Sequence, residues 1–122
     1  MQELSLIYNN KLFKSVSNSG TGEVSPETVF HYHQKGNIVW ATYKGGSILL
    51  GNLIAKADEN GYLTMRYQHL NSQQEFMTGI CTSRPEIMAN GKIRLYEEWQ
   101  WTSGDYSRGS SIIEEVDSEA AK

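Results

Sequence analysis

Hydrophobic and polar residues alternate most regularly in the stretch KIRLYEEWQWT, residues 92–102. Successive side chains of a β-strand point to opposite faces, so this alternation predicts a strand with one apolar face. The predicted apolar face carries Ile93, Leu95, Glu97, Trp99 and Trp101. Glu97 is the exception on this face, because a buried carboxylate needs a hydrogen-bonding partner or water. Glu97 is therefore the first candidate functional residue.

Short runs of β-forming residues recur along the rest of the chain, and each ends at a group of turn-forming residues such as Gly45-Gly46 or Asn90-Gly91. We expect Pro85 to end the fifth of these runs. The N-terminal segment, residues 4–16, predicts one bent strand or a small hairpin. The other predicted strands are residues 28–34, 37–44, 47–57, 62–70, 75–83, 92–102 and 107–116. The pattern is typical of an all-β antiparallel meander.

The pattern Gly-x-Ile/Leu follows four of the turns and predicts which residues face the interior. Counting in steps of two from each apolar residue gives the inward set. Besides the strand at residues 92–102, this set contains Ile38, Trp40, Thr42, Ile48, Leu50, Asn52, Ile54, Leu63, Met65, Tyr67 and His69. Closing roughly eight such strands into an up-and-down barrel removes exposed edges. We therefore predict a small calycin/lipocalin-like barrel, with a β-sandwich as the alternative.

Composition limits the partners and the cellular location. The chain has 122 residues, which fits one barrel domain at residues 1–117 with a flexible tail at 118–122. A net charge of −3 argues against binding to nucleic acid or to an anionic membrane surface. No signal peptide and no stretch long and apolar enough to cross a bilayer is recognised. The single cysteine, Cys81, cannot form an internal disulfide, so we expect a cytoplasmic protein in which Cys81 fills the core.

The predicted interior mixes aromatic and polar side chains, which is typical of a ligand pocket. The candidate ligand-binding residues are Trp40, Asn52, Tyr67, Glu97, Trp99 and Trp101. They favour a non-enzymatic barrel that binds a small apolar or aromatic molecule and needs no cofactor. The alternative is a solid core in which the polar groups pair with each other, for example Tyr67 with Glu97. Such a protein would act through its surface, as a homo-oligomer or with another partner.

A third hypothesis is a barrel enzyme. Burial would raise the pKa of Glu97 and make it a usable acid or base, with Tyr67 and His69 in support. Phenolic acid decarboxylases resemble this arrangement in architecture and in the kinds of residue used, although no motif matches.

The pair His31 and His33 has the spacing of metal ligands on a strand. Phe30 precedes this pair and Tyr32 lies between the two histidines, and both are better core residues. Because neighbouring side chains on a strand alternate in direction, both imidazoles are then expected to point outward. We therefore predict no metal site.

Several segments resemble a family of short bacterial proteins that are widespread in Bacteroidetes-type genomes and are often named N-acetylglutamate synthase. The resemblance covers nearly the whole chain and is most specific in EEWQWTSGD, residues 97–105. That name implies acetyl transfer from coenzyme A, which requires a pyrophosphate cradle at a strand-to-helix junction. No such segment occurs in this sequence, so we interpret the name as a misannotation.

Overall fold

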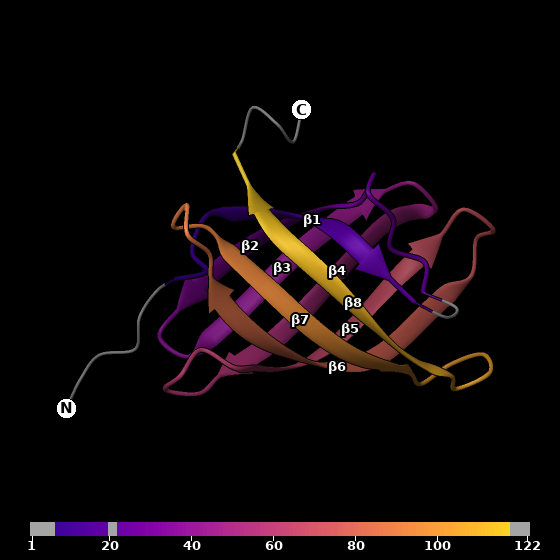
Figure 1. Ribbon diagram of the computed structural model, residues 1–122. Coiled ribbons are helices and arrows are strands. Elements are labelled where there is room, and N and C mark those ends of the chain that lie inside the picture. The colour runs from indigo at the N-terminus through magenta and orange to yellow at the C-terminus, as the bar shows by residue number, and fades with distance from the viewer. Residues whose placement is uncertain (1–6, 20–21, 118–122) are drawn as a thin grey trace.

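The computed structural model describes residues 7–19 and 22–117, which form eight antiparallel strands in a closed barrel (Figure 1). Each strand pairs with the next along the chain. The strands are β1 (Lys11–Asn18), β2 (Val29–Lys35), β3 (Ile38–Gly45), β4 (Ile48–Ala57), β5 (Leu63–Asn71), β6 (Phe76–Ile87), β7 (Ile93–Trp101) and β8 (Arg108–Val116). The predicted all-β up-and-down barrel is confirmed, while the predicted tail at 118–122 lies outside the described residues.

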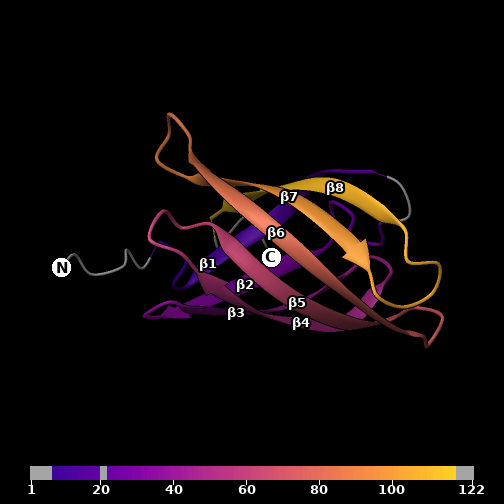
Figure 2. The same cartoon turned by 90° about the horizontal axis from the view of Figure 1, so that it is seen from below.

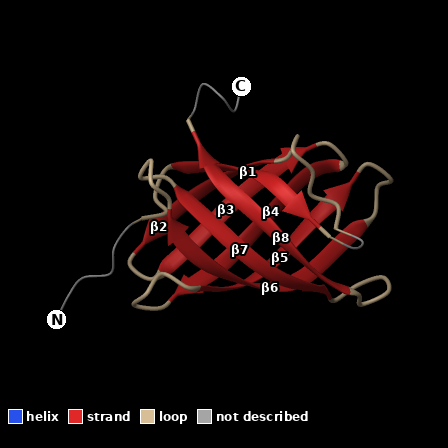
Figure 3. Cartoon of the chain, in the orientation of Figure 1, coloured by secondary structure: helices blue, strands red, loops and turns tan. Residues whose placement is uncertain are grey.

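Pairing between the first and last strands closes the barrel. β1 and β8 run antiparallel from the pair Leu12 and Val116 to the pair Asn18 and Ser111. This contact leaves neither strand with a free edge, and it rules out the alternative of a β-sandwich. Figures 2 and 3 show the resulting single layer of tilted strands joined by short turns. The described residues contain no helix with the length and apolarity needed to cross a bilayer.

Strand β3 faces the opposite way from the prediction. Phe30 and Tyr32 on β2 are buried, as expected. The two-residue turn between β2 and β3 pairs Lys35 directly with Ile38, and paired residues share a face of the sheet. Lys35 points outward, so Ile38, Trp40 and Thr42 do as well. The inward residues of β3 are Val39, Ala41 and Tyr43.

A β-bulge reverses the predicted faces of β4. Ile48 is buried as expected, but the pairing with β5 shifts register between Ile48 and Leu50. One extra residue on a strand moves every later side chain to the other face. Leu50, Asn52 and Ile54 therefore lie outside, contrary to the prediction. The predicted inward phase holds on β5 and on β7.

Strand β6 continues past Pro85 to Ile87, so the prediction that this proline ends the strand is wrong. Pairing with β5 stops at Ser83, whereas pairing with β7 continues to the pair Ile87 and Ile93. Beyond Ser83 the β5 side of the strand has no partner. A proline there sacrifices no ladder hydrogen bond.

The two ends of the barrel differ. Tyr8 closes one end, because its side chain is fully buried and its hydroxyl donates to the carbonyl oxygen of Gly61. The backbone N–H of Tyr8 donates to the side-chain oxygen of Gln34, 3.1 Å away. Phe13 and Tyr32 pack behind Tyr8, with ring centroids 4.8 Å apart. The opposite end holds the polar and aromatic interior residues considered next.

Candidate functional site

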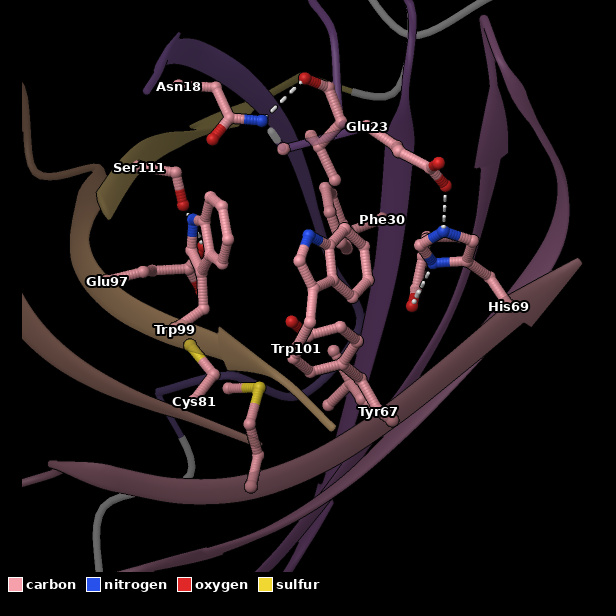
Figure 4. Close-up of a pocket in the computed structure, with 15 residues that line it drawn as sticks. Asn18, Glu23, Phe30, Tyr67, His69, Cys81, Glu97, Trp99, Trp101 and Ser111 are labelled. Atoms are coloured by element: carbon pink, nitrogen blue, oxygen red, sulfur yellow. Dashed lines mark hydrogen bonds and ion pairs between the residues drawn. The ribbon is translucent and has the colours of Figure 1, made fainter. Parts of the chain in front are cut away.

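A cavity opens at the end of the barrel opposite Tyr8. Figure 4 shows the side chains that line it. About 50 Å³ is open to the centres of water-sized spheres, and about 480 Å³ is free of atoms when the opening to solvent is included. Its lining residues come from all eight strands and from the segment between β1 and β2. They are Asn18, Gly22, Glu23, Val24, Phe30, Tyr43, Leu53, Met65, Tyr67, His69, Cys81, Glu97, Trp99, Trp101 and Ser111.

Glu97 lies in the cavity wall between two serines on the neighbouring strands. Ser83 on β6 and Ser111 on β8 are the residues directly opposite Glu97 in the two ladders. Each hydroxyl donates to a different carboxylate oxygen at 3.0 Å. The hydrogen bonds that a buried carboxylate needs thus come from the cross-strand neighbours of Glu97. The solid-core alternative had expected them from Tyr67.

These serines do not neutralise the charge of Glu97. Burial raises the pKa of the Glu97 carboxyl to about 7, while the two serine hydrogen bonds act in the opposite direction. Near neutral pH the carboxyl therefore exchanges its proton readily. It is suited to bind a positively charged group or to transfer a proton.

Aromatic side chains form the rest of the wall, with Trp101 at the centre. Its ring meets those of Tyr67 and His69 edge to face, at centroid distances of 5.8 and 5.7 Å. Trp99 lies 5.7 Å from Trp101 on the other side. These contacts fix the orientation of the rings, as expected of edge-to-face pairs.

Three rings of the wall each lie over a glycine on the next strand. Tyr43 is paired with Gly51, Tyr67 with Gly79, and Trp99 with Gly109. A Cβ atom added to any of these glycines would lie within 2.5 Å of the opposing ring. Glycine at these positions lets the ring lie flat on the wall and leaves space along the barrel axis. These three pairs are called the ring–glycine pairs below.

A segment from the β1–β2 connection covers part of the cavity mouth. The carboxylate of Glu23 lies 2.8 Å from Nε2 of His69 and 3.2 Å from the side-chain amide of Asn71. The Ser47 hydroxyl donates to the backbone oxygen of Glu23, and the Asn18 amide donates to that of Val24. Side chains of β1, of β5 and of the β3–β4 turn thus hold Glu23 and Val24 in place.

His69 lies below this segment with its side chain almost fully buried. Burial lowers its pKa, and the hydrogen bond and charge of Glu23 partly oppose that shift. The Tyr43 hydroxyl lies 3.0 Å from Nδ1 of His69. A neutral imidazole with its proton on Nε2 satisfies both neighbours, because it donates to Glu23 and accepts from Tyr43.

The structure brings most of the predicted site residues together. Tyr67, His69, Glu97, Trp99 and Trp101 all line the cavity. The candidate catalytic residues Glu97, Tyr67 and His69 share this cavity, but Glu97 is held by serines and His69 by Tyr43 and Glu23.

Two of the predicted ligand-binding residues lie elsewhere. Trp40 is 39% exposed and Asn52 is exposed, both on the outer surface, because of the reversed faces of β3 and β4. Conversely, the sequence analysis missed Asn18, Glu23 and Tyr43. The alternation of β2 carried through the two-residue turn would have placed Tyr43 inward, whereas no sequence pattern indicates Glu23.

His31 and His33 point outward as predicted, with ring centroids 4.4 Å apart. His33 also stacks on Trp40. Within residues 7–19 and 22–117, no three His, Cys, Asp or Glu side chains are grouped to hold a metal ion. Cys81 is a buried free thiol, and the cytoplasmic location inferred from the single cysteine stays a prediction.

We predict that Gly79→Ala destabilises the barrel by about 1–3 kcal/mol, because its Cβ would lie 2.2 Å from the Tyr67 ring. Alanine otherwise suits a strand better than glycine, so a loss identifies the steric conflict. Urea unfolding measures the change. In a Tyr67→Leu background the cost of Gly79→Ala should largely disappear. An equal cost in both backgrounds would contradict the ring–glycine explanation.

We predict that Glu97 makes folding stability fall with rising pH. Its carboxyl pKa is about 7 in the fold against 4.5 as the reference value, so protonation favours the folded state. The contribution is present below about pH 4.5 and is lost as the pH rises through 7, amounting to about 2–3 kcal/mol between pH 5 and 8. Urea unfolding across this range should show a smaller slope for Glu97→Gln. The exposed neighbour Glu98→Gln is the control, and an unchanged slope in Glu97→Gln would refute the assignment.

A comparison with protein families gives one match. The family described as avidin-like protein matches residues 6–116. No curated protein and no solved structure matches the sequence. The family has a calycin-type barrel, in agreement with the predicted fold and with the observed strand order. Because the match spans most of the sequence, this chain belongs to the avidin-like proteins.

Proposed function

We propose that this protein binds a small molecule in the cavity at the open end of the barrel. The observation that carries the proposal is the combination of aromatic walls with one buried, ionisable carboxylate. Trp99, Trp101 and Tyr67 offer flat apolar surfaces, and Glu97 offers a polar anchor between them. A few polar groups in an otherwise apolar cavity are typical of ligand sites.

The size of the cavity limits the ligand. Space for one water-sized sphere corresponds to about 10–15 Å³, so the present volume of about 50 Å³ holds several waters or a small organic group. A ligand with a whole aromatic ring requires the segment from Gly22 to Val24 to move outward. Side-chain hydrogen bonds hold this segment, and they can break without disturbing the barrel ladders.

Family membership supports this proposal. Avidin-like proteins typically bind small ligands, of which biotin is one example, and they often form oligomers. Family membership does not identify the ligand of this chain, because the chemistry of a ligand is set by the residues that line the cavity.

We predict that freshly purified protein carries a bound small molecule, which native mass spectrometry would detect and denaturation would release. Ser111→Leu should abolish the extra mass, because this side chain points into the cavity. Ser110→Leu is the matched control, since the adjacent side chain is exposed on the outer face.

If wild type carries no extra mass, the protein is screened against a small-molecule library by thermal shift. The proposal fails when no compound raises the melting temperature of wild type in a manner that Ser111→Leu removes.

A catalytic role for Glu97 is the second candidate, and the raised pKa of its carboxyl favours it. Turnover that Glu97→Gln abolishes while ligand binding persists would select this role. The described lining contains no Lys or Arg to hold a substrate carboxylate, which argues against phenolic acids. Acetyl transfer has less support, because the described residues form strands and turns without the strand-to-helix junction that coenzyme A binding requires.

We also propose that two copies of the chain associate through the outer face of β3 and β4. Ile38, Trp40 and Ile54 are 52%, 39% and 66% exposed, and Trp40 lies directly opposite Ile54 in the ladder. Adjacent exposed apolar side chains on a sheet typically mark an interaction surface. A second copy is the partner that the frequent oligomers of this family suggest.

We predict that analytical ultracentrifugation finds a dimer for wild type and a monomer for Ile54→Glu, because an interface over this face would desolvate the new carboxylate at a cost that pairing with the opposite Arg66 only partly offsets. Ile87→Glu is the matched control, since Ile87 is similarly exposed but lies at the far end of β6. A monomeric wild type at all concentrations would refute the association.

A further inference from the structure

The charged groups around the cavity have one sign. Two carboxylates, Glu23 and Glu97, are among the lining residues, and none of the described lining residues is Lys or Arg. Among the described lining residues His69 is the only basic side chain, and burial lowers its pKa so that the neutral form is favoured. The described part of the lining therefore offers no fixed positive charge to a ligand carboxylate or phosphate.

The cavity also contains hydrogen-bond acceptors whose capacity the protein does not fully use. Each Glu97 oxygen accepts one hydrogen bond from a serine and retains capacity for another. The side-chain oxygen of Asn18 is buried and has no hydrogen-bond partner among the described residues. A buried acceptor without a donor is costly, so a ligand N–H that reached it would restore the missing bond.

The aromatic walls add a third attraction of the same kind. The faces of Trp and Tyr rings carry negative potential and attract cations within about 6 Å. Trp99 lies beside Glu97, and Trp101 and Tyr67 line the wall farther across the cavity (Figure 4). In this largely desolvated space such an attraction is stronger than at a surface.

We infer that the ligand is a small organic cation, an amine in its ammonium form, which binds with its N–H groups on Glu97 and its carbon skeleton against Trp99 and Trp101. This inference rests on the proposed function and specifies the ligand class of the same cavity.

The other titratable groups near Glu97 do not compete with a cation. Tyr8, Tyr32, Tyr43, Tyr67 and Cys81 come from the N-terminal segment, β2, β3, β5 and β6, and each interacts with the Glu97 charge. The pKa of each is raised, mainly by burial, so all five stay protonated and neutral near neutral pH. Of Glu97 and these five neighbours, Glu97 is thus the group whose charge changes near neutral pH.

Three probes of similar size test the inference: benzylamine, benzyl alcohol and benzoate. Quenching of tryptophan fluorescence at about pH 8 should show benzylamine binding at least about ten-fold more tightly than the other two. Its affinity should fall by roughly thirty-fold at about pH 5.5, in proportion to the ionised fraction of a carboxyl with a pKa of about 7. Protonation of His69 at low pH acts in the same direction, because it adds a positive charge to the site.

Glu97→Gln should bring the affinity for benzylamine close to that for benzyl alcohol and remove most of the pH dependence. Glu98→Gln, one residue away on the outer face, should bind as wild type does. Melting curves check that both variants fold, and the comparison of probes on wild type requires no variant.

The outcomes separate this inference from the proposed function. Benzyl alcohol or benzoate binding as tightly as benzylamine would overturn the cation while leaving a ligand-binding barrel. A benzylamine preference that persists in Glu97→Gln would overturn the role of Glu97. Absence of quenching by all three probes would also overturn the inference, whereas the proposed function is judged separately by the co-purified mass and by Ser111→Leu.

Discussion

The site depends on the ring–glycine pairs between neighbouring strands. The interior of an eight-stranded barrel is only wide enough for its own side chains, so large rings pointing to the axis would fill it. Tyr43, Tyr67 and Trp99 instead lie over glycines, which draws the rings against the wall. At the other end, Tyr8 and its aromatic neighbours do fill the axis. The same barrel is therefore solid at one end and hollow at the other.

This division explains where a carboxylate can be tolerated. Glu97 lies at the border between the two ends, where serines on both adjacent strands supply hydrogen bonds and the cavity supplies access to water or ligand. Hydroxyl donors satisfy the lone pairs of a carboxylate without cancelling its charge, so the cost of burial persists and raises the pKa. Full neutralisation would need a cation. The described lining of this cavity provides none from the protein itself.

The alternation of apolar residues and the spacing of turns were sufficient to predict the barrel, because both follow from strand geometry alone. They also placed Glu97, Trp99 and Trp101 on one inward face. They failed on β3 and β4, where exposed apolar residues such as Trp40 imitate a core pattern and a bulge shifts the phase after Ile48. Pairing Lys35 with Ile38 across the two-residue turn would have corrected β3. Glu23 could not be predicted, since only tertiary folding brings it to His69 from 46 residues away.

The segment from Gly22 to Val24 at the cavity mouth places a second charged group on the path of an entering ligand. Glu23 is held at the mouth by His69 and Asn71, and its carboxylate adds negative charge to the entrance of a cavity that already contains Glu97. The hydrogen bonds with His69 and Asn71 hold Glu23 in this position. Both carboxylates line the cavity, so each attracts a cation that enters and repels an anion. Charge at the entrance and charge at the anchor thus select for the same kind of ligand.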